Sequence, residues 1–145
     1  MSSHEARISI DPAAEAGRLA DLFNDLSQAV DEFRLSDFDP PLTMSQMSRL
    51  KNEAQALEDR AHFFTAEAIG ATLQTIQQDL ANIKAVTAQA QQQFKVLTNI
   101  SKAITIATSA LSLATAIAAG NPVTIAAAAK DLAGTLGTGF DDNLG

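Results

Sequence analysis

The sequence predicts an all-α protein, an elongated helical bundle of the coiled-coil type. Apolar residues recur at three- and four-residue steps over long stretches, and capping residues stand ahead of these stretches. The apolar–polar alternation typical of strands does not occur. The 145 residues fit a single domain, 1–145. We expect helices at about 12–35, 43–69, 71–119 and 122–133, and flexible tails at 1–10 and 135–145.

The first helix is marked by its start. Asp11 is placed to cap it, and Pro12 to occupy its first position, where a missing N–H costs nothing. Apolar residues follow at helical spacing, and the helix is expected to end near Leu35, before the loop sequence SDFDPP. This apolar stripe consists of Leu19, Leu22, Leu26, Ala29 and Phe33.

The second helix begins with a capping box. Thr43 is the expected N-cap, and Gln46 stands three residues later, so each side chain can bond the other's backbone N–H. Leu42 and Met47 occupy the positions of a hydrophobic staple across this start.

Two heptad stripes fill the long stretch from Met44 to Ala119, and their spacing is typical of helices that pack on helices near 20°. The first stripe is Met47, Leu50, Ala54, Leu57, Ala61, Phe64, Ala68 and Ala71. The second stripe is Ile69, Leu73, Ile76, Leu80, Ile83, Thr87, Ala90, Phe94, Leu97, Ser101 and Ile104. From the second stripe, Leu73, Ile76, Leu80, Ile83, Phe94 and Leu97 are the predicted helix–helix packing residues.

The two stripes slip in phase around Gly70. This glycine either opens a tight turn or lies in one continuous helix with a kink or stutter. The flanking AEAIGATLQ has little turn chemistry, so we favour the continuous helix. It would be about 115 Å long at 1.5 Å per residue and would need partners along its length.

Charge is unevenly distributed. The formal net charge is −7, and the acidic residues concentrate before residue 68. Residues 68–130 hold only Asp79 against four lysines, too few for a basic stripe, so nucleic-acid binding is disfavoured. The chain has no cysteine, which excludes disulfides and thiol chemistry. No apolar signal segment opens the sequence, so we expect a cytoplasmic location in the producing cell, with export without a cleaved signal peptide as the alternative.

An uncharged run covers residues 103–129, and it forms the expected apolar helical hairpin near the C-terminus. Asn121 and Pro122 start its second helix, which should end at Gly134. The hydroxyl residues of its first helix lie on one stripe: Ser101, Thr105, Thr108, Ser112 and Thr115. The residues expected to meet a membrane or a buried interface are Ile104, Ile106, Leu111, Leu113, Ile117, Val123 and Ile125.

The run has two interpretations. It is either the covered central helix of a soluble bundle or a conditional membrane segment, because small residues pack helices in both settings. Residues 103–119 span about 25 Å, slightly short of a hydrocarbon core. The segment Thr72–Phe94 is rich in glutamine and other uncharged polar residues. Such a surface can either be buried in an assembly or remain exposed to water.

Catalysis and metal binding are disfavoured, and no cofactor is expected. Glu58, Asp59 and His62 could share one helix face, but a di-iron bundle needs such a pair from two helices, and the other histidine is His4. Residues 134–139 are glycine-rich, yet they lack the strand and the lysine of a phosphate loop. Of Phe63 and Phe64, one ring should pack in the core and the other should remain for an interface.

The layout over Thr72–Ala133 resembles helical pore-forming toxins of the haemolysin E type and the hydrophobic translocator subunits of type III secretion. Both join long heptad-patterned helices to an apolar hairpin rich in small residues. The resemblance implies a self-associating, non-enzymatic protein whose hairpin enters or docks on a membrane, as a pore-forming or translocator-like component. The alternative is a soluble helical assembly module with residues 103–129 buried against other helices or subunits. The expected partners are further copies or related helical subunits, and membrane lipid in the first case.

Overall fold

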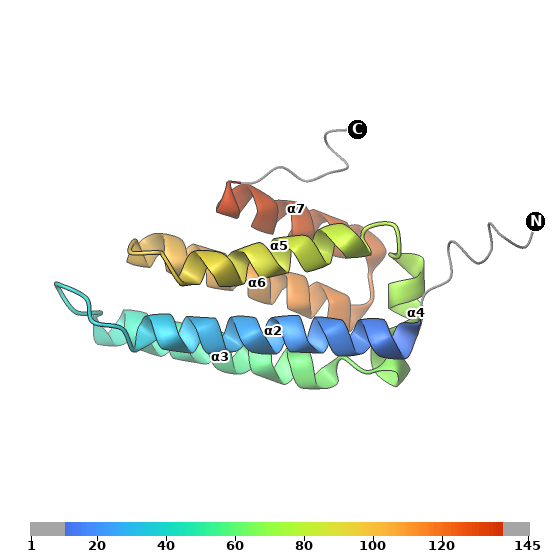
Figure 1. Ribbon diagram of the computed structural model, residues 1–145, viewed down its shortest axis with the longest axis horizontal. Helices are drawn as coiled ribbons and strands as arrows, with labels where there is room; N and C mark the ends of the chain where they lie inside the picture. The colour runs from blue at the N-terminus through green and yellow to red at the C-terminus, as the bar shows by residue number, and fades with distance from the viewer. Residues whose placement is uncertain (1–10, 138–145) are drawn as a thin grey trace, which may run out of the picture.

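The computed structural model describes residues 11–137, and this part of the chain is all-helical, with six helices and no strand (Figure 1). The predicted all-α bundle is therefore confirmed, whereas coiled-coil packing and the hairpin form of residues 103–129 stay predictions. Residues 1–10 and 138–145, most of the expected tails, lie outside the described residues. The helices are α2 (Pro12–Arg34), α3 (Met44–Phe63), α4 (Ala66–Thr75), α5 (Leu80–Phe94), α6 (Ile100–Ala119) and α7 (Pro122–Leu136).

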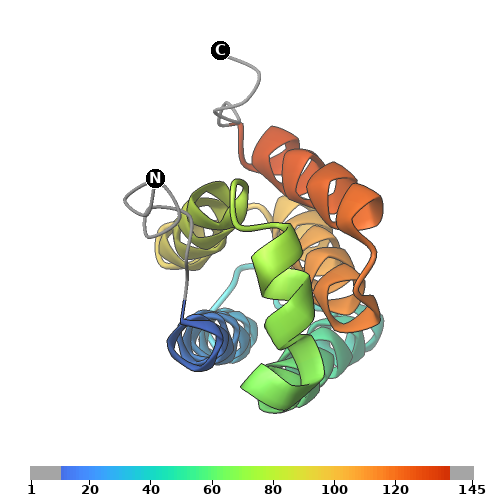
Figure 2. The same ribbon diagram turned by 90° about the vertical axis from the view of Figure 1, so that its right-hand side faces the viewer.

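Five of the helices form a closed ring around the core. Helix α2 packs on α3 and α5, α3 packs on α6, α6 on α7, and α7 returns to α5. The end-on view in Figure 2 shows this ring, with α4 crossing one end of it. Helix α4 contacts α2 and α6, so it covers the end of the core and carries the chain from α3 to α5.

Three helix starts are capped as predicted. The Asp11 carboxylate accepts hydrogen bonds from the N–H groups of Ala13 and Ala14, and Thr43 and Gln46 form the complete capping box. The Asn121 side chain caps α7 in the same way as Asp11 caps α2. These side chains satisfy N–H groups that a helix start leaves unpaired, which is why the starts could be read from the sequence.

The long helix predicted through Gly70 is wrong. Helix α3 ends at Phe63, and further breaks follow at 76–79 and at 95–99, so the longest described helix is α2, with 23 residues. The chain reverses inside the bundle instead of forming a rod. Its own helices supply the partners that a rod would have needed from outside.

The first break depends on Phe64 and Thr65. The Phe64 ring is buried and meets Phe23 edge-on at a centroid distance of 5.5 Å, and the Thr65 hydroxyl then caps α4 at the N–H of Ala68. A turn is therefore made without glycine or proline. Asn99 makes the third break in a similar way, because its side chain accepts from Lys102 N and starts α6.

Gly70 lies inside α4 and has a packing role. A Cβ atom built there would stand 3.3 Å from Cβ of Pro12, so the absence of a side chain lets α4 approach the start of α2. The phase slip predicted around Gly70 lies close to a real break, but its cause is the break at Phe64 and Thr65, five to six residues before Gly70.

The second stripe lies mostly in the core although the helix that carries it is broken. Its members from Ile69 to Phe94 are buried, whereas Leu97 and Ile104 are half-buried and Ser101 is exposed. In the first stripe, Ala68 and Ala71 are exposed because they follow the break. Apolar spacing therefore identified core residues more reliably than it identified helix ends.

The last helix is longer than predicted. Helix α7 runs through Gly134 to Leu136 and ends at Gly137, which adopts the left-handed conformation with φ of 81°. The expected tail at 135–145 is therefore wrong for its first two residues, and Leu136 is buried in the core.

Two glycines should respond oppositely to alanine. Gly120 has φ of 83°, and a Cβ there would lie 3.0 Å from the Thr72 hydroxyl oxygen, so Gly120→Ala should lower the free energy of unfolding by about 1–2 kcal/mol. Gly134 lies in α7 with open space around it, so Gly134→Ala should raise that free energy by about 0.5–1 kcal/mol. Urea unfolding of both variants measures the two effects. Equal signs would contradict the roles assigned to these glycines.

Candidate interaction surface

Helix α6 lies at the edge of the bundle between α3 and α7 (Figure 2). One side of it faces the core, where Ile106, Leu113 and Ile117 are fully buried. The other side faces solvent. We call this side the α6 outer face, and it consists of Ser101, Thr105, Thr108, Leu111, Ser112, Thr115, Ala118 and Ala119, all of them exposed or half-buried.

The α6 outer face carries no charged side chain from Ala103 to Ala119. Its hydroxyls do not need a partner to stay satisfied, since a helical serine or threonine can donate to the carbonyl four residues earlier. Thr105 does so, with its hydroxyl 3.0 Å from the Ser101 carbonyl oxygen. By contrast, the solvent-facing side of α2 carries Asp21, Asp25 and Glu32.

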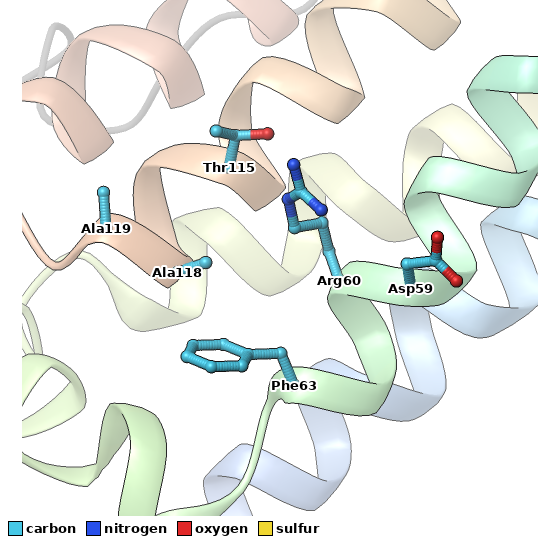
Figure 3. Close-up of a pocket in the computed structure, with 6 residues that line it drawn as sticks. All are labelled: Asp59, Arg60, Phe63, Thr115, Ala118 and Ala119. Carbon is cyan, nitrogen blue, oxygen red and sulfur yellow. The ribbon is translucent and has the colours of Figure 1, made fainter.

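A first groove, the α3–α6 groove, lies beside this face and has a volume of about 400 Å³. Figure 3 shows the Arg60 side chain directed toward Thr115, while the Asp59 carboxylate points away from α6. The Phe63 ring extends toward Ala118 and remains 47% exposed, which is high for a phenylalanine. The groove thus combines an apolar floor, one aromatic ring and the Arg60 guanidinium, with Asp59 at its rim.

A second groove, the α6–α7 groove, adjoins the first and also has a volume of about 400 Å³. Leu111 and Ser112 line it from α6, and Thr124 lines it from α7. Thr115 and Ala119 line both grooves, so the two grooves flank the C-terminal half of α6. Exposed Val123 lies next to Thr124 in the sequence, at the start of α7.

A buried carboxylate holds α6 against α3 beneath this face. The side chain of Glu53 is only 9% exposed, and its Oε2 atom accepts a hydrogen bond from the Thr108 hydroxyl. Arg49 lies on the solvent side of the same cluster, with Nε 3.5 Å from Glu53 Oε2 and Nη2 3.3 Å from Thr108 Oγ1. On the opposite flank of α6, the hydroxyls of Ser109 and Thr135 lie 3.3 Å apart and join α6 to α7.

The structure divides the predicted residues of the uncharged run between core and surface. Ile106, Leu113, Ile117 and Ile125 are fully buried, Ile104 and Leu111 are half-buried, and Val123 is 79% exposed. The five residues of the hydroxyl stripe form the centre of the α6 outer face, four of them exposed and Thr108 half-buried. The predicted packing residues from Leu73 to Phe94 are in the core, and Leu97 is half-buried.

Other candidate residues fall outside this surface or were missed. His62 is exposed, His4 lies outside the described residues, and within residues 11–137 no group of three or more acidic, histidine or cysteine side chains could hold a metal ion. Of the two adjacent phenylalanines, Phe64 is in the core and Phe63 is exposed. Sequence reasoning missed Arg60 and Glu53, because their importance depends on α6 lying beside α3, which spacing along one helix does not reveal.

The bond between Glu53 and Thr108 should contribute measurably to stability. Thr108→Val keeps the shape of the side chain but removes the donor to a buried carboxylate, so it should lower the free energy of unfolding by about 1–3 kcal/mol. Thr105→Val is the matched control, because Thr105 is exposed and bonds only to its own helix. It should change that free energy by less than about 0.5 kcal/mol. Equal effects of the two variants in urea unfolding would show that the Glu53 contact contributes little.

No protein-family model, no curated protein and no solved structure matches this chain.

Proposed function

We propose that this protein is a non-enzymatic helical interaction module whose α6 outer face binds a helix of another protein molecule. The observation that carries the proposal is the lack of charge from Ala103 to Ala119 on a helix whose outer side faces solvent. A helix that faces only water normally carries charged residues on that side, as α2 does.

The chemistry of the face suits burial against protein. Burying a charged side chain without a partner is costly, and α6 itself has none to bury from Ala103 to Ala119. Its hydroxyls can bond their own helix, so they keep a partner when water is removed. Alanine and serine side chains are short, which lets a second helix approach to the 8–10 Å axis separation usual for packed helices.

The two grooves supply the shape that helix packing requires. Side chains of one helix form ridges that fit between the ridges of another. Here the C-terminal half of α6 is a low ridge between the α3–α6 groove and the α6–α7 groove, which share Thr115 and Ala119. An incoming helix would place its larger apolar residues in either groove and cover the exposed ring of Phe63.

A photo-crosslinker on the face tests the proposal. The chain has no cysteine, so Ser112→Cys carries a benzophenone at one known place, and Gln28→Cys on the exposed side of α2 is the matched control. In extracts of the producing cells we expect discrete protein adducts from position 112 and none from position 28. Adding Thr115→Lys should reduce the adduct at least about tenfold, because it places an unpaired charge in the contact.

Thr115 is exposed, so Thr115→Lys should leave the free energy of unfolding within about 0.5 kcal/mol of the parent. Equal adducts from both positions, or an adduct that Thr115→Lys does not reduce, would contradict a binding role for this face.

A second candidate, membrane insertion, is favoured by a different observation. By length and composition alone, α6 is the one helix within residues 11–137 that could cross a membrane, with a mean hydropathy of 1.5. Only 44% of this segment is buried, so part of it already faces outward. On this proposal α6 leaves the core under a trigger, as the resemblance to pore-forming and translocator proteins implies.

Vesicles separate the two candidates. If α6 inserts, an environment-sensitive fluorophore on Ser112→Cys should shift to the blue on vesicles of anionic phospholipid, at neutral or acidic pH, with release of trapped dye. Thr115→Lys should then lower dye release at least about tenfold, since a lysine within the hydrocarbon costs about 2.5–3.5 kcal/mol. Leu113→Asp is unsuitable because Leu113 is fully buried and its loss would unfold the bundle. No shift and no release at either pH would exclude insertion.

A further inference from the structure

The α3–α6 groove carries an acidic and a basic residue next to each other on α3. Asp59 is exposed and Arg60 is half-buried, and neither forms an ion pair with any residue in the part of the chain that the structure describes. The Asp59 carboxylate accepts only from the amide of Gln55, at 3.3 Å. Most of the other groups around this groove are uncharged, so these two charges are its principal electrostatic feature.

Adjacent charges of opposite sign on one helix form a pattern that complements itself. When two copies of such a helix meet antiparallel across a two-fold axis, each residue i faces residue j of the other copy, and j faces i. An axis between residues 59 and 60 therefore brings each carboxylate opposite a guanidinium. No charge of either copy is left facing its own sign.

We propose that the occupant of the α3–α6 groove is a second copy of this chain, bound across such a two-fold axis. Asp59 then pairs with Arg60 of the partner subunit, and Arg60 pairs with Asp59 of the partner subunit. This inference rests on the proposed function, because it names the partner of that surface.

The same register gives the exposed aromatic ring a place. With residues 59 and 60 opposite each other, Phe63 lies opposite position 56, where α3 has a half-buried alanine. Ala56 lies on the same face of α3 as Asp59, Arg60 and Phe63, because these residues follow one another at steps of three and four. Each ring can therefore lie over the small side chain of Ala56 of the partner subunit, and the half-exposed Phe63 becomes covered in both copies.

The size of the contact indicates a weak dimer. In this register the two α3 helices overlap only from Ala56 to Phe63, about 12 Å at 1.5 Å per residue, because α3 ends at Phe63. With the adjoining part of α6, each helix about 10 Å wide, each copy offers about 240 Å², well below the roughly 800 Å² of a standard interface. We therefore expect a monomer–dimer equilibrium with a dissociation constant in the upper micromolar range. Sedimentation velocity from about 1 to 300 μM covers this range.

Charge reversal gives a test with internal rescue. Asp59→Arg alone and Arg60→Asp alone each place like charges opposite each other twice, so each should raise the dissociation constant at least about tenfold. An equimolar mixture of the two variants restores both ion pairs and should form a heterodimer with nearly the parental constant. The double variant D59R/R60D should likewise dimerise as the parent does.

Matched controls keep the test specific. Asp25→Arg on α2 and Lys51→Asp on α3 reverse exposed charges away from the groove and should leave the dissociation constant unchanged. All of these substitutions are at exposed or half-buried positions, and their unfolding curves should stay close to that of the parent. A parent that remains monomeric to 300 μM, or single reversals without effect, or a mixture that fails to restore the dimer, would overturn the two-fold dimer.

The outcome for the dimer is separable from that for the interaction surface. In one result the parent stays monomeric while the crosslinker at position 112 still captures a protein, and Thr115→Lys reduces this adduct. That result would refute a second copy as the partner and would indicate that the surface binds a different protein. The opposite result is also distinguishable. If the mixture of Asp59→Arg and Arg60→Asp dimerises but the Ser112 crosslinker forms no protein adduct, the two-fold dimer stands. Protein binding by the rest of the α6 outer face is then refuted.

Discussion

The rest of the structure depends on the need to cover an uncharged helix on its apolar side. Helix α6 has no charged residue from Ala103 to Ala119, and its core side carries three fully buried branched residues. Helices α3 and α7 pack on its flanks, and α5 and α4 contact it as well. The ring of helices is the arrangement that removes this side of α6 from water. The hydrophobic burial of α6 therefore favours a chain that reverses into a bundle over one that extends into a rod.

Polar contacts then decide which side of α6 faces out. The hydroxyl of Thr108 donates to buried Glu53 on α3, and Ser109 meets Thr135 on α7. A buried carboxylate that loses its donor is costly, so rotating α6 about its axis would be penalised. The two contacts hold adjacent residues of α6 to opposite neighbours, which leaves Ser112 and Thr115 directed to solvent. The orientation of the uncharged outer face is thus set by specific polar contacts. A helix held only by apolar contacts could rotate about its axis at lower cost.

The sequence predicted the class, the capped starts and the core more accurately than the connections. Helix starts were predicted from the N-cap residues Asp11, Thr43 and Asn121, and core residues were predicted from the stripe between Ile69 and Phe94. Both predictions succeed because capping and apolar spacing depend on residues within one or two helical turns. The breaks at Thr65 and Asn99 were missed because neither glycine nor proline marks them. Phe64 turns the chain by burying its ring against Phe23, a contact between residues 41 positions apart. The candidate site was only half predictable for the same reason: the hydroxyl stripe lies on one helix, whereas the groove needs Arg60 and Phe63 from another.

Whether the outer face serves protein or lipid is decided by what happens to the side of α6 that is already buried. Docking of a protein leaves the core as it is and adds contacts on the outer side. Insertion into a bilayer would cover α6 with lipid, but it would expose to water the apolar residues of α3 and α7 that α6 now covers, at about 25 cal/mol for each Å². It would also break the contacts of Thr108 with Glu53 and of Ser109 with Thr135. A helix richer in leucine would gain enough free energy on insertion to offset those losses. A helix composed largely of alanine, serine and threonine gains much less. The composition of α6 therefore favours a partner that binds the bundle over a membrane that takes it apart.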